Sequence, residues 1–120
     1  MSSTLEPMII TPDLPRLMRF YTALLDAEET DRHPADGDAF FVGLRIGGSD
    51  LGLVNDAGVE LGAPQRMLIS VAVDDVDGLL GRVEQLGGRV EGPATDMPWG
   101  QRVAHVQDPD GNAVNLTQQL

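Results

Sequence analysis

Two stretches of this chain carry the same pattern 62 residues apart, and this duplication limits the possible folds more than any other feature. Apolar residues stand at positions 14, 17, 18, 21 and 24, a spacing typical of one face of a helix. The same spacing returns at positions 76, 79, 80, 83 and 86. Asp13 and Asp75 precede the two sets, where their side chains can cap the free N–H groups of a helix. The sequence therefore predicts two equivalent helices in two equivalent units.

Strand-like segments surround both predicted helices in the same order. A short apolar run comes before each helix, a brief strand is expected after it, and two longer segments joined by turn residues close each half. In the first half these segments are 7–11, 28–31, 39–46 and 51–54. In the second half they are 67–73, 89–91, 102–107 and 113–117, offset by nearer 63 residues at the end. Each half therefore follows the order β-α-β-β-β.

The predicted fold is α+β, with tandem βαβββ modules that form a curved mixed sheet with the helices outside. Repeat one covers about 5–55, a linker about 56–65 and repeat two about 66–120, within one domain of 120 residues. A half of about 55 residues cannot cover both faces of its own sheet. We therefore expect the concave face to form a ligand cleft lined by both copies.

Composition excludes several classes of function. The chain has no cysteine, which excludes thiol catalysis, disulfides and cysteine-bound zinc. Its net charge of −11 opposes binding to nucleic acid or to an anionic membrane, and it suits a cationic small molecule or simply solubility. No apolar run is long enough to span a membrane, and residues 1–7 lack the pattern of a signal peptide. We expect a cytoplasmic protein.

Three groups of motifs carry a family resemblance that covers nearly the whole chain. They are Asp13-Leu14 with Phe20-Tyr21 and Leu24-Leu25, then Val73-Asp74-Asp75-Val76-Asp77, and finally Pro98-Trp99-Gly100 with the turn Asp108-Pro109-Asp110-Gly111-Asn112. The chain resembles the vicinal-oxygen-chelate superfamily of glyoxalase I, extradiol dioxygenases, fosfomycin-resistance enzymes and bleomycin-resistance proteins. Independently of the resemblance, the spacing of the aspartates in these motifs favours helix caps and turns over acid–base or metal chemistry.

The resemblance also indicates where a metal would bind. Enzymatic members usually hold a divalent metal through side chains on the first and last strands of each half. The matching positions here are Glu6, Gly52, Leu68 and Asn115. Only Glu6 is a strong ligand, whereas a catalytic zinc site needs about three protein ligands. We therefore predict no metal and no cofactor, and a likeness to the metal-free bleomycin-type resistance proteins, which sequester drugs as acidic dimers.

Four candidate ligand contacts come from the second half and from the former metal positions. Trp99 can stack on a planar or cationic ligand, or it can pack on a helix or a partner subunit. His105 precedes the DPDGN turn and should share a strand face with Val103. Asn115 and Glu6 should face the cleft if the fold is correct.

Three further candidates come from the first half. Phe40 and Phe41 are adjacent on one strand and must point to opposite faces, and Phe41 is favoured as the residue of the cleft. Arg45 can bind an anionic ligand or pair with surface acids. His33 is expected in a polar loop over 31–38, where it can form a lid or remain a surface residue.

These observations favour a metal-free protein that binds a small cationic or aromatic molecule. The alternative is a glyoxalase-like lyase or isomerase, or a dioxygenase, including a metal-free enzyme with His105 or Glu6 as its acid–base group. A scaffold without a ligand also remains open. We expect a homodimer, because pairing would cover exposed sheet edges, whether the repeats associate within one chain or between two.

Overall fold

Two compact units make up the chain, Met1–Glu60 and Leu61–Leu120. The computed structural model describes residues 5–63 and 65–120. The boundary between the units lies inside the predicted linker over 56–65. Each unit has its own helix and its own mixed sheet, in the order predicted from the sequence.

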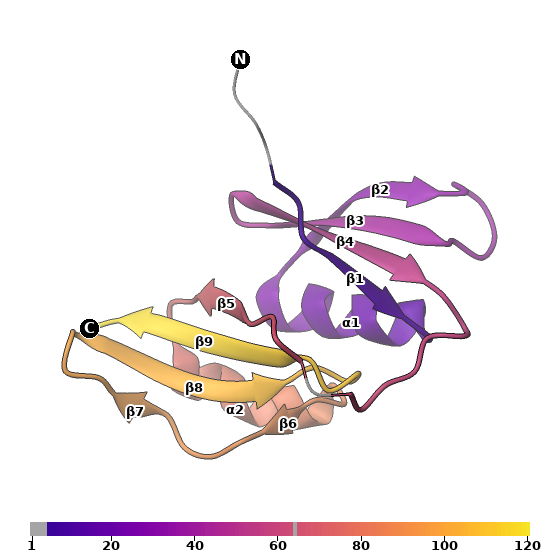
Figure 1. The fold of residues 1–120 in the computed structure, drawn as a ribbon. Coiled ribbons are helices and arrows are strands. Elements are labelled where there is room, and N and C mark those ends of the chain that lie inside the picture. Colours follow the sequence, from indigo (N-terminus) through magenta and orange to yellow (C-terminus); the bar gives the residue numbers. More distant parts are fainter. Residues whose placement is uncertain (1–4, 64) are drawn as a thin grey trace. The chain divides into compact units, whose positions relative to one another are not determined.

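The first unit is a four-stranded sheet with one helix packed on it (Figure 1). Its elements are β1 (Met8–Thr11), α1 (Leu14–Leu25), β2 (Glu28–His33), β3 (Phe41–Ile46) and β4 (Ser49–Asn55). The strand order is β1-β4-β3-β2, with β1 parallel to β4 and the other pairs antiparallel. The predicted α+β fold of tandem βαβββ modules is confirmed in this unit, although β2 runs two residues further than expected.

The second unit repeats this arrangement with one additional short strand. Its elements are β5 (Ile69–Ala72), α2 (Val76–Gln85), β6 (Arg89–Val90), β7 (Thr95–Asp96), β8 (Gln101–Gln107) and β9 (Ala113–Gln119). The strand order is β5-β9-β8-β6, with β5 parallel to β9, and β7 also pairs with β8. The β7 strand was not predicted, because its two polar residues carry no alternation of apolar and polar side chains.

The strand register shows that equivalent residues of the two repeats pair in the same way. In the first unit Met8 pairs with Gly52, which pairs with Gly43. In the second unit Ser70 pairs with Asn115, which pairs with His105. The first and third positions are offset by 62 residues and the middle one by 63. The extra residue therefore lies in the turn between β8 and β9.

Both helices begin at the predicted aspartates. The side chain of Asp13 accepts a hydrogen bond from the N–H of Arg16, and that of Asp75 accepts one from Gly78, each at 3.2 Å. The α2 helix ends at Gln85 with Leu86 as its C-cap, and Gly87, the next residue, has a φ of 92°, the left-handed conformation expected for this glycine.

The core of the first unit forms under α1. Leu17, Phe20 and Tyr21 are fully buried, and the two aromatic rings meet edge to face with centroids 5.1 Å apart. Phe20 was not part of the expected apolar set, which contained Met18 in its place. Edge-to-face pairs add about 0.5–1.5 kcal/mol beyond the burial of their area.

The DPDGN sequence folds as the turn that its residues favour. Asp108 is 2% exposed, and its Oδ1 accepts hydrogen bonds from the N–H groups of Asp110 (3.0 Å) and Asn112 (2.9 Å). Its Oδ2 accepts from the side-chain amide of Asn112 at 2.8 Å. The structural roles expected for Asp108 and Asp75 are confirmed.

Ion pairs of Arg102 connect β8 to β7 and to α2. The Arg102 guanidinium donates to Asp96 on β7 (Nε–Oδ1, 2.7 Å) and to Asp77 on α2 (Nη1–Oδ2, 2.9 Å). The hydrogen bond from Arg102 lowers the pKa of Asp96. Asp77 therefore has a structural role as well, as the sequence spacing predicted.

A second capping device occurs in both units and was not recognised from the sequence. The Asn55 side-chain oxygen at the end of β4 accepts a hydrogen bond from the N–H of Leu14, the first residue of α1, at 3.2 Å. The Gln118 side-chain oxygen on β9 accepts one from the N–H of Val76, the first residue of α2, at 2.9 Å. Each helix start is therefore tied to the central strand of its own sheet.

We expect Asn55→Leu and Gln118→Met each to lower the free energy of unfolding by about 1 kcal/mol, because each leaves a helix N–H without its acceptor. Hydrogen exchange should become faster at the first turn of α1 in the Asn55 variant and of α2 in the Gln118 variant. Gln85→Met is the matched control, since Gln85 is exposed on α2. Unchanged exchange at the helix starts would contradict the assignment.

Candidate functional site

Each sheet has one face covered by its helix and one face without a helix (Figure 1). In the first unit the buried side chains of Val42, Leu44 and Leu53 point to the α1 side. The alternate residues of these strands therefore lie on the opposite face. We call this opposite face of each sheet its helix-free face. Most of the predicted ligand contacts lie on these two faces.

Three side chains of the first unit converge over Gly52 on its helix-free face. A Cβ atom placed on Gly52 would lie 3.0 Å from Met8 Cγ, 3.1 Å from Phe41 Cε2 and 3.3 Å from Glu6 Oε1. The absence of a side chain at Gly52 is what lets these groups approach one another. The Glu6 carboxylate and the edge of the Phe41 ring therefore lie next to the same point above Gly52. Glu6 and Phe41, both predicted contacts, are therefore neighbours.

His33 extends this aromatic surface. It is the last residue of β2, paired with Phe41, and the two rings stack with centroids 6.0 Å apart and planes 29° from parallel. The expected position in a loop over 31–38 is wrong for this residue, because the strand ladder with β3 continues through His33 and the loop begins after it. Phe40 comes just before β3 and is 60% exposed.

Arg45 lies on the same face but is already paired. Its Nε contacts Asp50 Oδ1 at 2.5 Å, across the β3–β4 ladder in which the two residues are direct partners. The hydrogen bond to Asp50 raises the pKa of Arg45. Pairing with a surface acid, one of the two roles expected for Arg45, is the contact present.

The helix-free face of the second unit carries a pair of polar side chains. His105 Nδ1 lies 2.6 Å from Asn115 Oδ1, and the two residues are direct partners across β8 and β9. Val103 shares the face of His105, whereas fully buried Ala104 points to the α2 side, as alternation predicted. Ser70 on β5 pairs with Asn115 on its other side. A hydroxyl, an amide and an imidazole therefore form one row across three strands.

Trp99 lies in the turn between β7 and β8. The N–H of Gly100 bonds the carbonyl of Met97 at 3.0 Å, and Gly100 has a φ of 91°. The indole Nε1–H donates to Gln101 Oε1 at 2.9 Å, and the Trp99 side chain is 66% exposed. The Trp99 ring is therefore exposed just before the first residue of β8.

The four positions at which the resemblance places metal ligands do not form a donor set. Glu6 is a carboxylate and Asn115 an amide, but Gly52 has no side chain and Leu68 is apolar and 55% exposed. Among residues 5–63 and 65–120, no group of three or more His, Asp or Glu side chains is close enough to hold a metal ion. The residues present do not fit a divalent metal of the usual kind.

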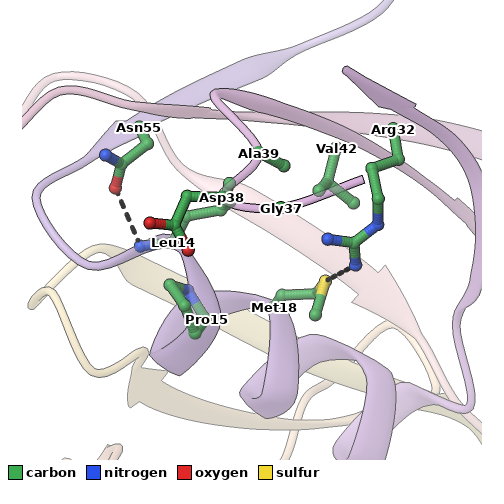
Figure 2. Close-up of a pocket in the computed structure, with 9 residues that line it drawn as sticks. All are labelled: Leu14, Pro15, Met18, Arg32, Gly37, Asp38, Ala39, Val42 and Asn55. Atoms are coloured by element: carbon green, nitrogen blue, oxygen red, sulfur yellow. Dashed lines mark hydrogen bonds between the residues drawn. The ribbon is translucent and has the colours of Figure 1, made fainter. Parts of the chain in front are cut away.

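A cavity of about 230 Å³ lies on the other side of the first sheet, against α1 (Figure 2). Its lining residues are Leu14, Pro15, Met18, Arg32, Gly37, Asp38, Ala39, Val42 and Asn55. Arg32 donates to Glu29 and lies 3.7 Å from Met18 Sδ, and the hydrogen bond to Glu29 raises the pKa of Arg32. None of the seven predicted contacts lines this cavity. Gly37, Asp38 and Ala39, in the loop before β3, form part of its wall, and only turn-forming residues marked this loop in the sequence.

Comparison with known proteins places the chain in a family. Residues 4–116 match the sequence model of the Glyoxalase/Bleomycin resistance protein/Dioxygenase superfamily. The chain belongs to this superfamily. The resemblance identified from the sequence motifs is confirmed, and the superfamily includes proteins of antibiotic resistance as well as enzymes.

Individual superfamily relatives extend this result. CFP32 from Mycobacterium bovis, described as a candidate glyoxylase, is 31% identical over 112 residues, which are 90% of this chain and 42% of CFP32. The chain thus spans less than half the length of this relative. The structure of the hypothetical protein SA1046 from S. aureus has 27% identity and a TM-score of 0.76, with 98% of both chains covered.

The fold is also that of a fosfomycin-resistance protein. FosX from Listeria monocytogenes has 19% identity and a TM-score of 0.78, with 100% of this chain and 95% of that chain covered.

In the part of the chain that the structure describes, neither helix has the length and apolar character needed to cross a membrane.

The Gly52→Ala variant tests whether Met8, Phe41 and Glu6 lie close together over Gly52. The added methyl should displace the Phe41 ring and lower the free energy of unfolding by about 1 kcal/mol, because its neighbours already lie at 3.0–3.3 Å. Ring proton chemical shifts of Phe41 and His33 should change. Gly48→Ala is the control, since a Cβ there meets nothing within 4 Å. Equal shift changes in both variants would contradict the described packing.

Proposed function

We propose that this superfamily member binds a small molecule with a cationic or aromatic group, without a metal, on the helix-free faces of its units. The observation that supports this most is that the Glu6 carboxylate and the Phe41 ring both lie next to the same point above Gly52. In such a protein the ligand is retained rather than transformed, as in the bleomycin-type resistance proteins that the sequence resembles.

The chemistry of the Glu6–Phe41 pair suits a cation. A positive group placed against both would gain the attraction of the carboxylate and of the ring face, which is worth about 0.5–2 kcal/mol for the ring alone. The stacked His33 ring enlarges the aromatic area to which a flat ligand can adhere. The net charge of −11 favours the approach of a cation and opposes that of an anion.

The second unit would contribute different contacts. His105 and Asn115 offer hydrogen-bonding groups on its helix-free face, and exposed Trp99 offers a ring for stacking. We do not propose Arg45 as a ligand contact, because its charge is already paired with Asp50. The homodimer and the cytoplasmic location expected from the sequence stay predictions.

Titration with bleomycin and with two matched probes tests the proposal. We expect the 1-methylquinolinium cation and bleomycin to bind, and naphthalene sulfonate, an anion with a similar ring system, to bind at least tenfold more weakly. Calorimetry measures each affinity, and the fluorescence of Trp99, the one tryptophan of the chain, gives a second readout. Glu6→Gln and Phe41→Leu should each weaken binding of the cation about five- to tenfold.

The control variant is Glu60→Gln, which removes the same charge from an exposed position outside the helix-free face. It should leave the affinity within about twofold. Binding that is equally strong for the anion, or unaffected by Glu6→Gln and Phe41→Leu, would overturn the proposal.

A glyoxalase-like lyase or isomerase, or a dioxygenase, is the alternative function. It is favoured by the likeness to CFP32, a candidate glyoxylase, and by the enzymes in the superfamily. The metal-dependent form of such chemistry would need more ligands than Glu6 and Asn115 supply, whereas a metal-free form would use His105 or Glu6 as its acid–base group.

Elemental analysis separates our proposal from a metal-dependent enzyme. Protein purified without chelator or affinity tag should contain far less than one equivalent of zinc, manganese, nickel or iron per chain if our proposal is correct. Equilibration with 1 mM of each metal followed by gel filtration should leave this result unchanged. Near-stoichiometric retention of one metal would favour the enzyme.

A further inference from the structure

The His105–Asn115 pair has features of a site and not of a folding element. In the first unit the equivalent positions across β3 and β4 are Gly43 and Gly52, which pair in the same register without any side chain. Strand pairing at this row therefore does not need the two side chains. His105 is exposed and Asn115 only half-buried, so neither supplies the core of the second unit.

The chemistry of the contact determines which ring nitrogen carries the proton. Asn115 Oδ1 is a carbonyl oxygen and can only accept a hydrogen bond. His105 Nδ1, at 2.6 Å from it, must therefore be the donor. A neutral imidazole has one N–H, so the second nitrogen, Nε2, then has a free lone pair.

We infer that Asn115 is a positioning residue that holds His105 in its Nδ1–H tautomer, so that Nε2 accepts a hydrogen bond from a ligand hydroxyl or N–H group. This inference rests on the proposed function, since it names the class of ligand that the helix-free face of the second unit selects. That class is aromatic or aliphatic molecules with a hydrogen-bond donor, such as phenols and amines. Ethers and other molecules that offer only acceptors are disfavoured, because Nε2 would meet a lone pair.

The tautomer can be measured without any ligand. Two-bond ¹H–¹⁵N spectra of the histidine rings at pH about 9, above the ordinary titration range of histidine, distinguish the two tautomers. We expect Nδ1–H at His105 in the native protein. Asn115→Asp should preserve this tautomer, because a carboxylate oxygen still accepts from Nδ1–H, and Asn115→Leu should abolish the preference.

His33 is the internal control in the same spectra. It is stacked on Phe41, and an Asp31 oxygen lies 3.8 Å from its Nε2. Its signals should be the same in all three proteins. An Nε2–H tautomer at His105 in the native protein, or a spectrum that Asn115→Leu leaves unchanged, would overturn the inference.

The ligand class can be tested with phenol and anisole. In anisole a methyl group replaces the hydrogen that the phenol hydroxyl donates. Phenol should shift the His105 Nε2 resonance and bind about five- to tenfold more tightly than anisole, and Asn115→Leu should reduce this ratio to about one. Equal affinities in the native protein would overturn the donor preference while the proposed binding function stands. Failure of every aromatic probe to bind would overturn the proposed function, even if the spectra establish the tautomer.

Discussion

The parallel pairing of the first and last strand of each unit is the constraint on which the remaining structure depends. Two parallel neighbours in a sheet cannot be joined by a tight turn, so the chain must cross the sheet between them. Here β1 lies beside β4 and β5 beside β9, and the crossing begins with α1 or α2. The helix then covers one face of the sheet, and the other face is left for polar and aromatic side chains.

Much of this arrangement could be predicted from the sequence. The spacing of apolar residues and the aspartates before them identified both helices and their starts, because capping is a local interaction between neighbouring residues. The turn around Asp108 was predictable for the same reason. The amide oxygens of Asn55 and Gln118 at the helix starts were not, since each contact joins residues more than 40 positions apart.

The candidate site was predicted residue by residue but not as a set of contacts. Alternation along a strand indicated that Phe41 points away from the face of Phe40 and that His105 shares its face with Val103. The stacking of His33 on Phe41 depends on where β2 ends, and strand ends are poorly marked when the residues are all polar. The approach of Glu6 and Phe41 to one another depends on Gly52 on β4, the strand that lies between β1 and β3, so register was needed to recognise it.

The extra residue between β8 and β9 has a consequence for how the two halves could diverge. Because this residue lies in the turn, the strands of both hairpins keep equivalent pairing. Gly43 pairs with Gly52 in the first unit, and His105 pairs with Asn115 at the equivalent place in the second. In the first unit this row pairs without any side chain, so the pairing itself does not require histidine or asparagine at these positions. A duplicated chain of this kind can therefore acquire a new ligand preference in one half while the other half retains its own.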